Sequence, residues 1–169
     1  MDAAELRATQ APIKERYRTE PKAALITLKA KGSIENDGIA CKVETGRALA
    51  VAGLHPASGG SGLELCSGDM LLEALVACAG VTLKSVATAI EAPLKSGHVF
   101  AEGDLDFRGT LGVDKETPVG FESIRLRFEV ETDAPQDKLD LLLKLTERYC
   151  VVYQTIKNGP KVSVSMHRM

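Results

Sequence analysis

The chain has 169 residues, of which 44% are hydrophobic and 4% aromatic, and tryptophan is absent. This length suits one domain with or without a terminal extension, and aliphatic side chains must fill most of its core. The formal net charge is −2 with no block of like charges, so the composition gives no electrostatic basis for binding nucleic acid or an anionic membrane. The N-terminus lacks the basic-then-apolar pattern of a signal peptide, which together with four cysteines favours a reducing, cytoplasmic compartment.

The first part of the chain reads as a polar extension. Residues 1–22 are helix-prone, and Pro12 and Pro21 bracket a charged segment that predicts a short helix at most. We therefore expect an N-terminal helical extension at 1–22, followed by a domain at 23–169.

Three short strands open the predicted domain. Apolar residues in the segments 24–30, 39–43 and 48–54 predict a hairpin or meander, with Asp37-Gly38 as its clearest turn signal. The Gly-rich loop at 55–62 lacks the Lys-Ser/Thr pair of a phosphate-binding loop, so we expect no nucleotide site there.

A long helix is predicted over 70–92, preceded by capping residues at 67–69 and ended by Pro93. Its apolar residues occupy nearly every face, which predicts burial on all sides. A chain of this length can hardly surround six helical turns alone, so we expect a second subunit to cover part of the helix. Glu73 and Lys84 interrupt the apolar run, which favours a core helix over a membrane span. We expect Glu73 to be paired across that dimer.

Two long strands are predicted after this helix, over 99–112 and 121–132. In the second strand, apolar and charged side chains alternate strictly, which predicts a sheet with one face on the core and the other in water. The apolar set consists of Ile124, Leu126, Phe128 and Val130.

A second helix and a closing strand complete the chain. Asp133 predicts the N-cap of this helix, with Pro135 in its first turn. The helical pattern continues towards Cys150 and stops at Asn158, and a closing strand is predicted at 161–166. The order of elements predicts an α+β fold in which sheet packs against helices.

The cysteines are the main candidates for chemistry. Cys78 and Cys150 are 72 residues apart, so they form no local redox or zinc motif and can meet only through the fold. Two interpretations stay open at this point: a functional thiol pair, or two buried and inert thiols. Cys41 and Cys66 are expected to be bystanders, with Cys66 as an alternative thiol.

Two segments resemble the OsmC/Ohr family (osmotically inducible protein C and organic hydroperoxide resistance protein). The segment Ser67–Thr82 resembles the family's central helix, and Leu145–Cys150 resembles its second-cysteine segment, near the start of the last helical segment. The resemblance implies an antiparallel sheet wrapped around long buried helices in an intertwined homodimer, with active sites at the interface. It also implies that Cys78 is a peroxidatic thiol and Cys150 a resolving thiol in the reduction of peroxides by external thiols. No metal or organic cofactor is implied.

The sequence departs from the family at the groups that activate the first cysteine. The hydroperoxide reductases use an arginine on an early strand and a glutamate ten residues before that cysteine. Gly68 stands at the glutamate position, so the adjacent Asp69 is the candidate acid, and it could help only from a cap or loop conformation. Ala40 stands at the arginine position. Lys42 or Arg47 would then have to supply the cation, although lysine lacks the planar fork of arginine.

These departures leave two functional hypotheses. The first is a thiol peroxidase or stress-response redox protein, favoured by the two cysteines. The second is a non-enzymatic OsmC-fold binder of a hydrophobic ligand, or a thiol redox sensor, favoured by the missing glutamate and arginine. Because Cys78 lies beyond the first turn of its own helix, its pKa is expected to stay near that of an ordinary buried thiol unless a cation lies close by.

Overall fold

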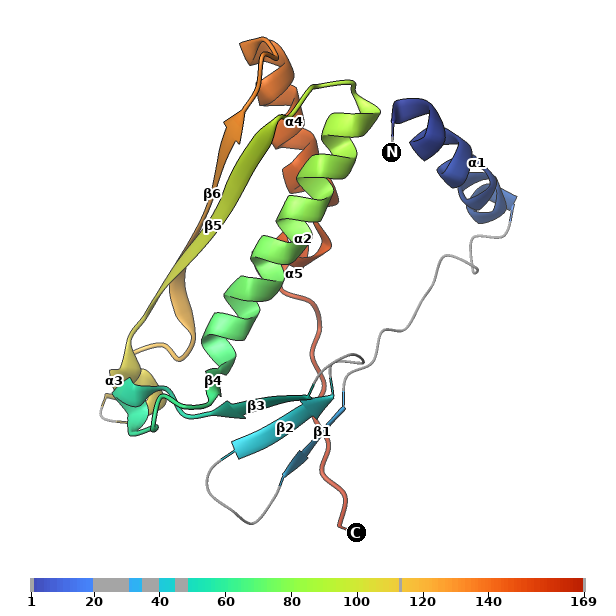
Figure 1. The fold of residues 1–169 in the computed structure, drawn as a ribbon. Coiled ribbons are helices and arrows are strands. Elements are labelled where there is room, and N and C mark those ends of the chain that lie inside the picture. The colour runs from blue at the N-terminus through green and yellow to red at the C-terminus, as the bar shows by residue number, and fades with distance from the viewer. Residues whose placement is uncertain (1, 20–30, 35–39, 45–48, 113, 169) are drawn as a thin grey trace.

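A small sheet, a long helix and a two-stranded sheet backed by two further helices make up the fold (Figure 1). The computed structural model describes all residues except 1, 20–30, 35–39, 45–48, 113 and 169. The helices are α1 (Ala3–Thr19), η2 (Pro56–Ser58), α2 (Ser67–Ala89), α3 (Phe107–Thr110), α4 (Gln136–Tyr149) and α5 (Val151–Asn158). The strands are β1 (Lys31–Ile34), β2 (Ala40–Glu44), β3 (Leu49–Gly53), β4 (Leu65–Cys66), β5 (Ser96–Leu105) and β6 (Phe121–Glu131).

The N-terminal helix α1 is longer than predicted and runs through Pro12. It starts with a reciprocal capping box, in which the Asp2 N–H donates to Glu5 (2.9 Å) and the Glu5 N–H donates to Asp2 (2.8 Å). This start lies upstream of Pro12, which lacks the N–H for one helical hydrogen bond but does not end the helix. Arg7 of α1 forms an ion pair with Glu91 just beyond α2, at 3.5 Å.

The N-terminal sheet has the order β1-β2-β3-β4, with antiparallel pairs except for the parallel pair β3–β4. The predicted strands at 39–43 and 48–54 are confirmed by β2 and β3 to within two residues. The predicted strand at 24–30 and the Asp37-Gly38 turn lie outside the described residues. Because β4 leads directly into α2, this sheet lies at the N-terminal end of that helix (Figure 1).

The helix α2 is the centre of the core, and its predicted position is confirmed to within three residues at each end. Its buried residues form one stripe that packs against the inner face of β5–β6 and against α4 and α5; they are Leu75, Ala79, Leu83, Val86 and Ala87. Burial on all sides is not seen within one chain, since Val81 on the opposite face is 73% exposed. The helix is long and apolar enough to cross a membrane by length and composition, a test that core helices of soluble proteins also pass.

Strands β5 and β6 form an antiparallel ribbon whose inner face lies on α2. The alternation predicted for β6 is confirmed, because Ile124 and Leu126 are partly buried whereas Arg125 and Arg127 are exposed. The strand predicted over 99–112 was too long, because β5 ends at Leu105. There the Asp106 carboxylate accepts a hydrogen bond from the Arg108 N–H (2.9 Å) and starts the short helix α3.

The segment predicted as one helix near Cys150 is two helices, α4 and α5, separated by Cys150 with extended backbone angles (φ −71°, ψ 107°). The predicted N-cap was also wrong: Pro135, itself extended, occupies that position. The Asp133 carboxylate instead forms an ion pair with Lys95 at 2.7 Å. The break gives α5 an N-terminus of its own in the middle of the molecule.

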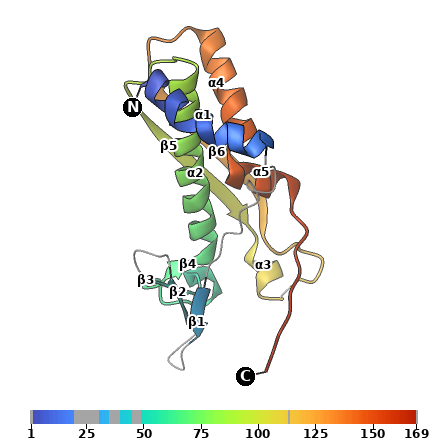
Figure 2. The same ribbon diagram turned by 90° about the vertical axis from the view of Figure 1, so that its right-hand side faces the viewer.

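The closing strand predicted at 161–166 is absent from the described structure. Residues 159–168 are an exposed tail, which Figure 2 shows running down one side of the molecule apart from β1–β3. A strand needs a neighbour to pair its backbone groups, and none of the described strands lies beside this tail. Its side chains Val162, Val164 and Met166 remain exposed.

Candidate active site

The structure brings the two candidate cysteines together. Cys78 lies midway along α2, and Cys150 lies at the junction of α4 and α5, where it is 1% exposed. Cys78 packs against a small apolar cluster formed by Leu75, Ala79 and Cys150. The expectation that the pair meets through the fold is therefore confirmed, and both thiols are free in this structure.

The N-terminus of α5 lies close to Cys78, because Val152 and Cys78 pack against the same cluster. Burial raises the pKa of Cys78, but hydrogen bonds from the Val152 N–H, the Cys150 thiol and the Val151 N–H outweigh it and lower the pKa overall. The Thr82 hydroxyl contributes least, because it also donates to the Cys78 carbonyl at 2.7 Å. Helix N-termini stabilise thiolates in this way, since their free N–H groups and dipole favour negative charge.

The pKa of the Cys150 thiol is shifted in the opposite direction. Burial raises its pKa, the Tyr153 N–H lowers it, and the neighbouring Cys78 raises it further, so the balance is upward. The Cys150 sulfur does not complete a capping hydrogen bond to α5. The arrangement therefore favours a Cys78 thiolate that accepts a hydrogen bond from a protonated Cys150, which is the polarity required of a nucleophile and its partner.

The expectation of an ordinary pKa for Cys78 was wrong for a structural reason. The N-terminus of α2 is remote from Cys78. The amides that lower its pKa belong to α5, which begins where the sequence pattern shows no break. The sequence carries no signal for this start, because proline, which favours the first position of a helix, does not follow Cys150. Val151 stands at that position here.

The other predicted site residues are not brought to the thiols by the described structure. Asp69 is exposed in the first turn of α2, on the face opposite Cys78 and about 14 Å away along the helix axis. Lys42 lies in β2, where its backbone pairs with Ser33 and Val51, but its side chain is outside the described residues. Arg47 lies outside them altogether.

The remaining candidates lie away from the pair. Cys66 is half-buried at the N-cap of α2, twelve residues and about 18 Å from Cys78. Glu73 is exposed on α2, and the pairing expected for it across a dimer is untested. In the part of the chain that the structure describes, no three His, Cys, Asp or Glu side chains are grouped closely enough to hold a metal ion.

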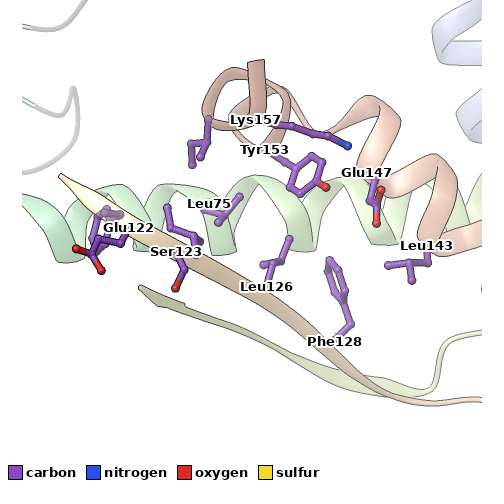
Figure 3. A pocket seen from close by; sticks show the side chains of 12 residues that line it. Leu75, Glu122, Ser123, Leu126, Phe128, Leu143, Glu147, Tyr153 and Lys157 are labelled. Carbon is purple, nitrogen blue, oxygen red and sulfur yellow. The ribbon is translucent and has the colours of Figure 1, made fainter. Parts of the chain in front are cut away.

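A cavity of about 490 Å³ lies beside the thiol pair, between β6, α4 and α5, with Leu75 of α2 in its wall (Figure 3). Leu126 and Phe128 form its apolar floor, and Tyr153 and Glu147 add polar groups. Leu75 and Tyr153 also belong to the cluster that packs around Cys150. An apolar molecule held here would lie against the same residues that surround the buried thiol.

The difference between the two thiols predicts selective alkylation. A lowered pKa gives Cys78 more thiolate than Cys150 near neutral pH, so iodoacetamide should label Cys78 first at pH 7. The preference should decline as the pH rises and Cys150 also ionises, and the rate at Cys78 should fall as the pH drops through its pKa. Peptide mapping of protein alkylated at several pH values measures both rates. Faster labelling of Cys150 than of Cys78 at pH 7 would contradict the proposed polarity.

Together these observations define an α+β protein with a paired-thiol site between a long central helix and a helix N-terminus. The family described as OsmC-like protein matches residues 59–165, and the chain belongs to that family. A search of curated proteins found no significant match.

Several solved structures share the fold. An OsmC-like protein from Mycoplasma pneumoniae superposes with a TM-score of 0.65 at 14% identity, covering 79% of this chain and 89% of its own. An organic hydroperoxide resistance protein OsmC from Legionella pneumophila gives 0.62 at 20% identity, covering 80% and 93%. An organic hydroperoxide resistance protein from Elizabethkingia anophelis gives 0.63 at 14% identity, covering 80% and 91%.

Proposed function

We propose that this protein is a thiol-dependent peroxide reductase acting in the response to oxidative stress, with Cys78 as the peroxidatic and Cys150 as the resolving cysteine. The observation that carries the proposal is the packing of Cys78 in one cluster with Val152 at the start of α5 and with the buried Cys150. The first contact favours the nucleophilic thiolate, and the second places a partner thiol beside it. Two of the structural neighbours are named organic hydroperoxide resistance proteins, which agrees with this chemistry.

The proposed reaction has three balanced steps. The Cys78 thiolate attacks the terminal oxygen of a hydroperoxide ROOH, the O–O bond breaks, and the alkoxide RO⁻ leaves and takes up a proton to form ROH. The Cys78 sulfenic acid then condenses with the Cys150 thiol, forming a disulfide and releasing water. Two equivalents of an external thiol reduce that disulfide by exchange and are themselves oxidised to a disulfide. These steps use thiols and peroxide only, and they require a reducing compartment, which we propose is the cytoplasm.

The surroundings of the pair favour organic over inorganic peroxides. Leu75, Ala79 and Val152 pack around the thiols. The neighbouring cavity has a mixed lining, in which Leu126 and Phe128 supply apolar surface. Burying the apolar part of an organic peroxide against such surfaces contributes favourable free energy, about 25 cal/mol per Å² removed from water. Hydrogen peroxide offers no such surface.

The test is peroxide consumption with dithiothreitol as reductant, comparing cumene hydroperoxide with hydrogen peroxide. We expect turnover of both, faster with cumene hydroperoxide, and a Cys78–Cys150 disulfide by mass spectrometry after a substoichiometric addition. If Cys78 stays reduced while Cys66 or Cys41 is oxidised, the enzymatic proposal is wrong.

The cavity favours one alternative function, a binder of a hydrophobic ligand whose thiol pair acts as a redox sensor. The cavity volume of about 490 Å³ falls within the range of small-molecule sites. The same assay separates the two functions. A sensor forms the disulfide once, without sustained consumption of peroxide, whereas a peroxidase consumes many equivalents while dithiothreitol lasts.

We also propose that the protein assembles as an intertwined homodimer. The exposed face of α2 carries Ala74, Ala77 and Val81, small apolar side chains that allow close approach of another helix. The tail residues Val162 and Val164 alternate with polar ones as a strand does, yet have no strand beside them in the described part of one chain. A second copy could cover that face of α2 and supply the missing strand partner.

This assembly predicts a large effect of one surface charge. Val81→Lys places an ammonium group on the proposed interface, where burying an unpaired charge is costly, so sedimentation should show monomers at micromolar concentration. Val119→Lys is the matched control, because Val119 has the same exposed fraction, 73%, but lies in the loop before β6. A wild-type protein that sediments as a monomer, or a dimer unaffected by Val81→Lys, would exclude this interface.

A further inference from the structure

The contact between Cys78 and α5 depends on how α5 is held relative to α4. The two helices are separated by the extended residue Cys150, so helical hydrogen bonds alone do not keep α5 in one orientation. No side chain of α5 is fully buried. Val152, Tyr153 and Ile156 pack against the cluster around Cys150, and a hydrogen bond across the break would further restrict the position of the first α5 amides.

The side chain of Gln154 makes such a connection. Its Nε2 donates a 2.7 Å hydrogen bond to the carbonyl of Glu147, in the last turn of α4. That carbonyl is one of the helix-terminal acceptors with no partner inside its own helix. The side chain is partly buried, and its Oε1 accepts from the Asn158 Nδ2 at 2.8 Å, which holds the amide group in register with α5.

The backbone of the same residue strengthens the link. The Gln154 N–H donates to the Cys150 carbonyl at 2.9 Å, and the Cys150 N–H donates to the Thr146 carbonyl at 2.9 Å. Gln154 is thus bonded to the junction residue through its backbone and to α4 through its side chain.

We propose that Gln154 is a positioning residue, which fixes the N-terminus of α5 against Cys78 by its hydrogen bond to the Glu147 carbonyl and thereby sets the reactivity of that thiol. Nothing in the sequence pattern marks this glutamine, since its role exists only where two helices meet at Cys150. The inference deepens the proposed function but concerns the thiolate itself, so it can be tested without peroxide turnover.

The titratable side chains in or beside the cluster around Cys78 are Cys150 at the junction, Tyr153 on α5 and Glu147 at the end of α4. The inward residues of β5 nearest the cluster, Val99 and Ala101, are apolar. A change in the pH profile of Cys78 after a neutral substitution at Gln154 would therefore report on the α5 amides.

The test is Gln154→Met, which keeps the length of the side chain and removes the donor. We expect the alkylation of Cys78 by iodoacetamide at pH 7 to slow by about two- to fivefold, the range that a helix N-terminus contributes to a nearby anion. The ultraviolet absorbance of the thiolate should appear at higher pH than in the wild type. At a pH where Cys78 is fully ionised, the two proteins should react at equal rates.

Gln136→Met is the matched control. Gln136 also donates a hydrogen bond through Nε2, but its acceptor Asp140 is on the same helix and the pair lies at the far end of α4. It should leave the alkylation profile unchanged. Hydrogen exchange gives a second measurement, in which the amides at 151–153 should exchange faster in Gln154→Met. An unchanged pH profile and unchanged exchange in Gln154→Met would overturn the inference, even if the variant is less stable. A shifted profile in a protein without peroxide turnover would refute the proposed function and leave the role of Gln154 intact.

Discussion

Replacing Cys78 with serine is expected to reduce peroxide consumption to the uncatalysed background. Serine keeps the shape of the side chain, but its hydroxyl does not ionise near neutral pH and cannot form a sulfenic acid or a disulfide. Cys150→Ser should behave differently. It should still oxidise once at Cys78, and excess peroxide should then drive the unresolved sulfenic acid to sulfinic and sulfonic acids.

Intact-mass analysis after stepwise addition of cumene hydroperoxide distinguishes these outcomes, with added masses of one, two and three oxygens on Cys78. Cys66→Ser is the matched control, since Cys66 lies at the N-terminal end of α2, away from the pair, and it should keep wild-type turnover. Sustained turnover in Cys78→Ser, or loss of turnover in Cys66→Ser, would show that Cys78 is not the peroxidatic thiol.

The second large effect concerns stability. Leu142 of α4 is 2% exposed and packs in the cluster with Leu83, Val86 and Ala87 of α2. Leu142→Ala removes most of this contact and leaves a cavity, so the free energy of unfolding should fall by about 2–5 kcal/mol. Urea denaturation at one fixed protein concentration measures the change, because dimerisation would make stability depend on concentration.

The neighbouring residue Leu141 provides the control. It has the same side chain on the same helix but is 45% exposed, so Leu141→Ala should cost less than about 1 kcal/mol. Equal losses of unfolding free energy in the two variants would show that the contact of Leu142 with α2 does not stabilise the fold.

Local patterns predicted several elements of this fold correctly. The alternation of Ile124 and Leu126 with charged residues specified β6 and its buried face, because side chains on a strand point alternately to opposite sides. The long apolar run bounded by capping residues and Pro93 located α2 for a similarly local reason. The resemblance of two segments to the OsmC/Ohr family made Cys78 and Cys150 the proposed pair among four cysteines, and the family match confirms the resemblance itself.

Other features were mispredicted because a local pattern fits two structures, and contacts with residues remote in the sequence decide between them. Asp133 is a good capping residue, but in the structure it pairs with Lys95, which is remote in sequence. The segment after Leu105 has a strand-like composition, but capping by Asp106 turns it into α3. The closing strand has a suitable pattern, yet a strand forms only beside another strand, and the described part of one chain offers none.

The sequence by itself determined the elements that depend on neighbouring residues, namely the buried face of β6 and the extent of α2. Only the tertiary structure decided what makes Cys78 distinctive. The backbone N–H groups of Val151 and Val152, more than 70 residues away at a helix start created by the break at Cys150, lower its pKa. The hydrogen bond of Gln154 across that break is equally invisible in the sequence. The physical reason is that a thiol pKa depends on the dipoles and charges within a few ångströms of the sulfur, and the fold, rather than the local sequence, brings those groups together.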